Sequence, residues 1–236
     1  MHELIYFESP GYAEPTRLCL ELSGLPWKNT TVEWDGYQEL KNNGELPWGY
    51  LPVLKTPSGT IAESGALMRY AASIAGLEPE DLYMRGKVDE IIELINGWRV
   101  HFTPTFYIED VDEKAAARKA LFAEGGKIDL GLKDLESLIA SSTTGWVANT
   151  ENISLADVKA FLNIFMMFSG QFDGIDASMI QPYPALLEYH NHVANEPRIK
   201  SYYDRDDELR WVFKPCLLYT SPSPRDATLS RMPSSA

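Results

Sequence analysis

The sequence predicts an α/β domain followed by an all-α helical domain, and two observations lead to this prediction. Up to about residue 77, short apolar or β-prone runs alternate with helical patterns in the order β-α-β-α-β-β-α. Beyond that point, apolar residues recur only at helical spacing. We interpret residues 76–79 as the linker, and we predict domains at 1–77 and 83–213.

The α/β domain begins with a strand. Residues 4–7 are apolar at every position, as in a central strand that is covered on both faces. Residues 14–22 follow as a helix with Pro15 in its first turn. Residues 27–33 contain the β-prone run Thr-Thr-Val and form a second strand, and residues 37–42 form a short helix.

Residues 49–70 complete this domain with two strands and a helix. Pro52 has no backbone N–H, so it stands where a strand begins. A turn at 57–59 leads to the second strand, and Glu63 and Ser64 stand at the start of an amphipathic helix. The N-terminus of a helix presents unpaired N–H groups and the positive end of its dipole, so this place suits a carboxylate or a phosphate.

The helical domain is predicted from its apolar stripes. Residues 88–102 form a long helix that bends or ends near Pro104, and residues 112–139 form a second helix that Gly125 and Gly126 interrupt. Ser154 is a good N-cap, with Asp157 three residues later. Two further helices, at 184–195 and 197–203, close the bundle.

Composition excludes several classes of function. A net charge of −13 argues against nucleic acid or an anionic membrane as the main partner. There is no signal-peptide pattern and no membrane-length apolar run, so we expect a cytoplasmic protein. Cys19 and Cys216 have no metal-site or disulfide spacing, and we predict neither a metal nor a prosthetic group.

The tail at 214–236 differs from the rest of the chain. Pro, Ser, Thr and Arg dominate it, and it has neither helical nor strand periodicity. It looks like translated adapter or cloning sequence, although a natural disordered tail has a similar composition. We predict that the tail is disordered and without function.

Several short motifs, taken in order, resemble the cytosolic glutathione transferases over roughly residues 2–210. They are Tyr6-Phe7 ahead of Gly11, Ala13-Glu14 and Arg17; Leu51-Pro52-Val53-Leu54; Glu63-Ser64; and Ser154-Leu155-Ala156-Asp157. The similarity is greatest to the sigma-like, tyrosine-type classes. It implies a thioredoxin-like first domain, a helical second domain, a homodimer and glutathione as co-substrate.

The resemblance also assigns roles to residues at the glutathione site. It implies a cis bond between Leu51 and Pro52, with the main chain of Leu51 pairing with the cysteinyl part of glutathione. Glu63 and Ser64 are expected to hold the γ-glutamyl end. The residues expected near the glycine end and the neighbouring loop are Tyr37, Lys41 and Tyr50.

Tyr6 is the expected catalytic residue, and Ser9 is its rival. A thiol of pKa about 8.5 is mostly protonated at neutral pH, and a hydroxyl that donates a hydrogen bond to sulfur favours the thiolate. Tyr6 ends the first strand, and ligands gather at such strand ends. Other classes use a serine, but the spacing from Tyr6 to Arg17 fits the tyrosine classes and Ser9 does not fit the serine pattern.

Two positions depart from the family pattern. Tyr50 stands where the family commonly has Gln, and Gly97 stands where a carboxylate would reach across the dimer, with Asn96 as the nearest substitute. Both departures predict a reduced affinity for glutathione.

A second, apolar substrate is expected to contact aromatic side chains, although packing between helices explains Trp98 and Phe102 equally well. The candidates are Phe7, Tyr12, Trp98, Phe102 and Phe106. The predicted reaction joins glutathione to small hydrophobic electrophiles. The alternatives are a glutathione-dependent isomerase of the prostaglandin-synthase type, a peroxidase, and a non-catalytic ligand-binding or structural protein.

Overall fold

The computed structural model describes residues 1–205 of the chain. They form two compact units, of which the first combines Met1–Pro79 with residues 196–205 and the second spans Glu80–Asn195. The predicted tail at 214–236 lies outside the described residues. The domain bounds at 77, 83 and 213 stay predictions.

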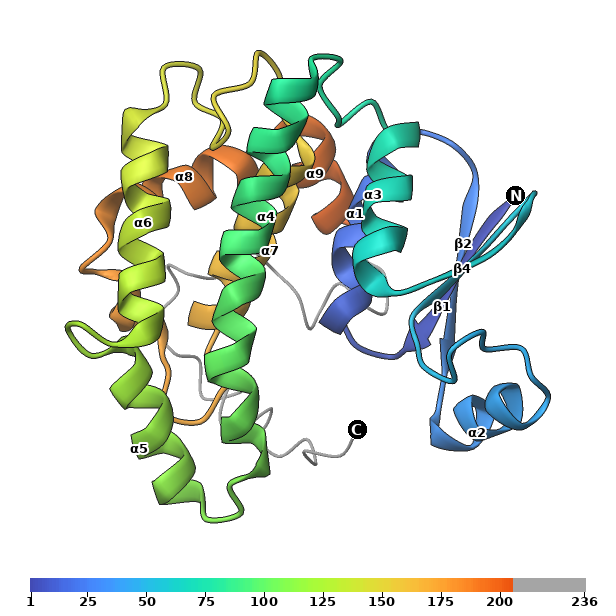
Figure 1. Cartoon of the computed structure of the whole chain (residues 1–236), viewed down its shortest axis with the longest axis horizontal. Coiled ribbons are helices and arrows are strands. Elements are labelled where there is room, and N and C mark those ends of the chain that lie inside the picture. The colour runs from blue at the N-terminus through green and yellow to red at the C-terminus, as the bar shows by residue number, and fades with distance from the viewer. Residues whose placement is uncertain (206–236) are drawn as a thin grey trace. The chain divides into compact units, whose positions relative to one another are not determined.

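A mixed four-stranded sheet lies at the centre of the first unit (Figure 1). In the order β2-β1-β3-β4, its strands are β2 (Trp27–Val32), β1 (His2–Phe7), β3 (Val53–Thr56) and β4 (Gly59–Ala62). β1 pairs in parallel with β2, whereas the pairs β1–β3 and β3–β4 are antiparallel. A parallel pair needs a crossover connection, and α1 (Glu14–Leu22) provides it.

Both faces of β1 are covered, as its apolar run predicts. α1 and α3 (Ser64–Ile74) lie side by side against one face (Figure 1). On the other face, Tyr37 of α2 (Trp34–Asn42) packs with Ile5 and Val53. β1 therefore has a fixed position between two layers, and the short 3-10 turn η1 (Gly11–Ala13) lies between it and α1 in the chain.

The last described helix, α9 (Pro197–Tyr203), belongs to the first unit. The Tyr203 hydroxyl donates a hydrogen bond to Glu14 Oε1 of α1 at 2.9 Å, and both side chains are buried. This contact joins two residues that are 189 positions apart in the sequence.

The second unit is helical, as predicted. Its elements are α4 (Leu82–Phe102), η2 (Thr103–Tyr107), α5 (Val111–Phe122), α6 (Lys127–Ser141), α7 (Leu155–Phe168), η3 (Ala177–Ile180) and α8 (Pro184–Ala194). The α4 helix runs beside α6 and α7 (Figure 1). Among residues 1–205, no helix is long and apolar enough to cross a bilayer.

Two predicted helix signals in this unit are confirmed. The chain breaks between α5 and α6 at Gly125, whose φ of 76° favours glycine. At the start of α7, Asp157 accepts hydrogen bonds from the Ser154 amide at 2.7 Å and from the Tyr189 hydroxyl at 2.6 Å. Asp157 therefore connects the start of α7 to α8 inside the core.

Candidate functional site

Three predicted site residues lie in a row at one edge of the sheet. The strand register pairs Ile5 with Val53 and Val53 with Ala62. Next to these pairs stand Tyr6, Pro52 and Glu63, which therefore lie beside one another at this edge. The Leu51–Pro52 bond is cis, as the resemblance implies.

Tyr6 is held from the turn that follows β1. Its side chain is 7% exposed, and its hydroxyl oxygen accepts a hydrogen bond from the Tyr12 amide at 3.3 Å. A phenol oxygen that accepts from an amide can still donate its own proton to another group. The arrangement is therefore suited to a hydroxyl that donates to a ligand.

Gly11 makes room for this hydroxyl. A Cβ atom at Gly11 would lie 2.6 Å from Tyr6 Oη and 2.8 Å from Cε1, and the φ of Gly11 is +41°. Only glycine fits both the space and this backbone conformation. In the sequence Gly11 is a motif residue, and its spacing after Tyr6 is the signal that marks it.

Arg17 fixes the turn between Tyr6 and Gly11. Its side chain is fully buried, and it donates hydrogen bonds to the carbonyl oxygens of Ser9 at 2.9 Å and Pro10 at 3.1 Å. Its other partners are Glu14 Oε2 at 3.0 Å and Asn29 Oδ1 at 2.8 Å. Ser9 is the alternative to Tyr6 for stabilising the thiolate, and in the structure its main-chain carbonyl oxygen anchors this turn through Arg17.

The start of α3 offers polar groups at the same edge. Glu63 is exposed and has the positive φ of 73°, and Ser64 is the first residue of the helix. The amide groups in the first turn of a helix have no acceptor within the helix, and the dipole adds a positive partial charge there. A carboxylate bound here would be stabilised by both.

Tyr37, Lys41 and Tyr50 form a small group around the end of α2. The Tyr37 hydroxyl donates to the carbonyl oxygen of Gly49 at 2.9 Å, which ties α2 to the loop before β3. Lys41 Nζ lies 5.8 Å from the centre of the Tyr37 ring and 6.0 Å from that of Tyr50. Tyr50 is 69% exposed, so this group presents an aromatic surface and a cation to a ligand.

The aromatic candidates are divided between the two units. Phe7 is half-buried and Tyr12 is exposed, and both belong to the first unit. In the second unit Trp98 is buried against α6, where a Cβ at Gly131 would lie 2.2 Å from Trp98 Nε1. The packing of Trp98 is therefore tight.

Phe102 and Phe106 form a cluster with two residues that no sequence motif marks as candidates. The cluster consists of Phe102, Phe106, Arg118 and Phe172. Phe102 is buried, whereas Phe106 is 41% exposed. No local pattern marks Phe172, because it follows α7 at a distance of more than sixty positions from Phe106 and meets it only through the fold.

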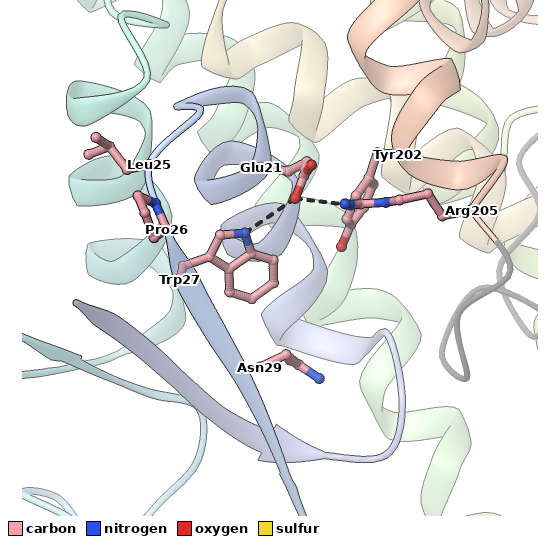
Figure 2. A pocket seen from close by; sticks show the side chains of 7 residues that line it. All are labelled: Glu21, Leu25, Pro26, Trp27, Asn29, Tyr202 and Arg205. Atoms are coloured by element: carbon pink, nitrogen blue, oxygen red, sulfur yellow. Dashed lines mark hydrogen bonds and ion pairs between the residues drawn. The ribbon is translucent and has the colours of Figure 1, made fainter.

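A separate cavity of about 340 Å³ opens in the first unit between α1, β2 and the end of α9 (Figure 2). Glu21 lies in its wall and binds Arg205 at 2.9 Å, and it accepts from Trp27 Nε1 at 3.2 Å. The remaining lining residues are Leu25, Pro26, Asn29 and Tyr202. None of the predicted site residues lines this cavity.

Cys19 does not provide an alternative sulfur chemistry. Its side chain is fully buried in α1, and burial raises the pKa of its thiol well above the ordinary value. A thiol that stays protonated is a poor nucleophile. The buried position of Cys19 therefore argues against a redox or nucleophilic role for this cysteine.

Known proteins resemble this chain over most of its length. Residues 4–79 match the family model of the glutathione S-transferase N-terminal domain, and residues 96–206 match that of the C-terminal domain. Glutathione S-transferase 2 of Manduca sexta is 26% identical over 204 residues, which are 84% of this chain and 93% of that protein. Glutathione S-transferase 4 of Caenorhabditis elegans is 24% identical over 205 residues, with 85% and 94% covered.

Solved structures also share the fold. The structure of prostaglandin synthase D of Nilaparvata lugens has a TM-score of 0.75 with this chain. The match covers 88% of this chain and 98% of the other, with 22% sequence identity. At this identity the likeness concerns the fold and not the substrate.

Proposed function

This chain belongs to the glutathione S-transferase family and is an enzyme of that family, and we propose that it joins reduced glutathione to small hydrophobic electrophiles, with Tyr6 stabilising the thiolate. The observation that supports this proposal is the place of Tyr6. The backbone of Tyr6 lies at the edge of the sheet beside Pro52 and Glu63, and its hydroxyl oxygen accepts a hydrogen bond from the Tyr12 amide.

The chemistry follows from the pKa of a thiol. At about 8.5, this pKa leaves only a few per cent of glutathione as thiolate at neutral pH. A hydrogen bond from the Tyr6 hydroxyl stabilises the charged sulfur and lowers the pKa of the thiol. The sulfur lone pair then attacks an electrophilic carbon, a carbon–sulfur bond forms, and the leaving group departs with its bonding electrons. The thiol proton goes to solvent.

Glutathione itself is proposed to lie along the edge of the sheet. The main chain of Leu51, next to Pro52, pairs with the cysteinyl part and so places the sulfur toward Tyr6. The γ-glutamyl carboxylate binds Ser64 and the start of α3, and its amine binds the carboxylate of Glu63. These contacts hold the thiol in a single orientation, which lowers the entropic part of the barrier.

The glycine end is proposed to bind near α2. Lys41 supplies the positive charge for the glycine carboxylate, and the rings of Tyr37 and Tyr50 flank it. Because Lys41 is exposed, its attraction is screened by salt and contributes a modest part of the affinity.

The second substrate is proposed to be apolar because the candidate residues for it are aromatic. They are Phe7, Tyr12, Trp98, Phe102 and Phe106. Of the three in the second unit, Phe106 has the most exposed side chain, whereas Trp98 and Phe102 are buried. Phe106 is therefore the residue of that unit that we expect to touch a ligand directly.

The homodimer and the cytoplasmic location stay predictions.

The proposal is tested with the full chain, immobilised glutathione and a chromogenic aryl halide. We expect retention on the glutathione resin and formation of the thioether. Retention without turnover of the aryl halide or of a hydroperoxide would contradict the catalytic proposal and favour a binding role. Turnover of the hydroperoxide alone would assign the thiolate to peroxide reduction instead of conjugation.

A further inference from the structure

Arg118 of α5 is a buried cation inside an aromatic cluster. Its side chain is 3% exposed. The guanidinium carbon lies 5.4 Å from the centre of the Phe102 ring, 5.2 Å from that of Phe106 and 5.5 Å from that of Phe172. Each distance is within the range of a cation–π interaction. The cation therefore contacts three rings at once.

The three rings also contact one another. The centroid distances are 5.5 Å for Phe102–Phe106, 4.9 Å for Phe102–Phe172 and 5.8 Å for Phe106–Phe172. The interplanar angles lie between 64° and 82°, which is the edge-to-face geometry that aromatic pairs favour. The three rings and the guanidinium therefore form one packed group.

Hydrogen bonds fix the guanidinium between three segments of the chain. Arg118 Nε donates to Thr105 Oγ1 at 3.1 Å, and Thr105 donates to the carbonyl oxygen of Phe102 at 2.8 Å. A terminal nitrogen lies 3.4 Å from both the carbonyl oxygen and the carboxylate of Asp173. Arg118 thus joins α5 to the end of α4, to η2 and to the segment after α7.

A buried cation is a costly way to fill space. Burial lowers the pKa of Arg118, which Asp173 opposes, and a well-packed apolar side chain would avoid the desolvation cost. The guanidinium makes directional contacts, because it is flat and its hydrogen-bond donors have a fixed geometry. The positions of the three rings therefore depend on it.

We propose that Arg118 is a positioning residue for the apolar substrate, because it holds Phe106 and its neighbouring rings in the orientation that the electrophile meets. This inference rests on the proposed function, since it takes Phe106 as a contact of the second substrate. Arg118 itself is buried and does not touch the substrate.

The test compares Michaelis constants for the two substrates. Arg118→Lys keeps the charge but loses the flat, forked donor group, and Arg118→Met removes the charge as well. We expect either change to raise the KM for the chromogenic aryl halide about fivefold, and to leave the KM for glutathione within about twofold. A merely structural loss would not separate the two constants in this way.

Lys119→Met is the matched control, because Lys119 is an exposed cation on the same helix and contacts none of the three rings. It should change neither KM. If Arg118→Met does not fold, Arg118→Lys and Thr105→Val provide the test, because Thr105→Val removes the hydroxyl that accepts from Arg118 Nε and donates to the Phe102 carbonyl oxygen.

The outcomes separate this inference from the proposed function. A wild-type chain with no turnover would overturn both. A wild-type chain that turns over, together with a folded Arg118→Lys variant whose KM for the aryl halide is unchanged, would overturn the positioning role alone. A rise in both KM values by the same factor would also overturn it.

Discussion

At the residue scale, the environment of Tyr6 depends on what is missing at position 11. A side chain at Gly11 would occupy the space next to the Tyr6 hydroxyl, and the backbone at Gly11 is left-handed. The buried Arg17 holds the two residues before this turn through their carbonyl oxygens. Tyr6 therefore has little room to adopt another position.

Gly11→Ala should lower turnover at least about tenfold, because a Cβ in van der Waals overlap displaces the Tyr6 ring by an amount that matters at a reacting centre. Gly24→Ala is the control. Gly24 also has a left-handed φ, +68°, but has no atom within 4 Å of the added Cβ. It has the same backbone cost of about 1 kcal/mol without the clash. Equal activity in the two variants would contradict this explanation.

The places of the candidate residues in the fold are easier to predict from the sequence than their contacts. Tyr6, Pro52 and Glu63 can be placed at one edge because each ends or begins a strand or helix that local patterns reveal. By contrast, the hydrogen bond from Tyr37 to Gly49 and the Arg118 cluster depend on the packing of segments that are distant in sequence. Local periodicity carries no signal for such contacts.

At the scale of elements, the start of α3 supplies the proposed site for the γ-glutamyl carboxylate. Ser64→Ala removes one hydroxyl donor but keeps the helix dipole and the amides. The KM for glutathione should rise roughly three- to tenfold, the equivalent of one hydrogen bond, with turnover at saturating glutathione unchanged. Ser58→Ala, in the exposed β3–β4 turn, should change neither value.

The α6 helix should make the second unit sensitive to acid. Burial acts to raise the pKa of Asp129, but hydrogen bonds from Tyr183, Lys133 and the Gly125 amide outweigh it and hold the pKa below its ordinary value. A lowered carboxyl pKa stabilises the folded state above the unfolded pKa of about 4, and this contribution is lost as the pH falls further.

The expected measurement is the thermal midpoint between about pH 6 and about pH 3. At the higher pH, Asp129→Asn should lower the free energy of unfolding by about 1–3 kcal/mol and so lower the thermal midpoint. The midpoint of the variant should also fall less as the pH is lowered. Asp134→Asn, at an exposed position on the same helix, is the control. An Asp129→Asn variant with the wild-type acid profile would contradict the role of this carboxylate.

The elements themselves were largely predictable. The α1 helix occupies the predicted residues 14–22, and the break between α5 and α6 falls at the predicted glycine pair. α2 begins earlier than predicted, at Trp34 instead of Tyr37, because the Asp35-Gly36 pair is typical of a turn and conceals the start of the helix.

At the scale of the whole molecule, the order of elements identifies two units, but the sequence does not reveal which of them α9 joins. Residues 197–203 have a helical pattern like those before them. Their place in the first unit depends on buried contacts such as Tyr203 with Glu14, which link the two ends of the described chain. Contacts at this sequence separation leave no local pattern.

Conjugation by the whole molecule depends on a stabilised thiolate, because the thiolate is the nucleophile. The central claim is that the Tyr6 hydroxyl, and not Ser9, stabilises the thiolate. The decisive measurement is the pH dependence of conjugation for the wild-type chain, Tyr6→Phe and Ser9→Ala, with a chromogenic aryl halide as the second substrate.

We predict that Tyr6→Phe reduces conjugation at neutral pH by about 100-fold and moves the rise of the rate toward the free-thiol pKa of about 8.5, because the variant has no proton to donate to sulfur. Ser9→Ala should keep the wild-type profile, since the wild-type Ser9 contributes its carbonyl oxygen to Arg17 and the variant retains that atom. Loss of conjugation in Ser9→Ala, with Tyr6→Phe fully active, would contradict the account.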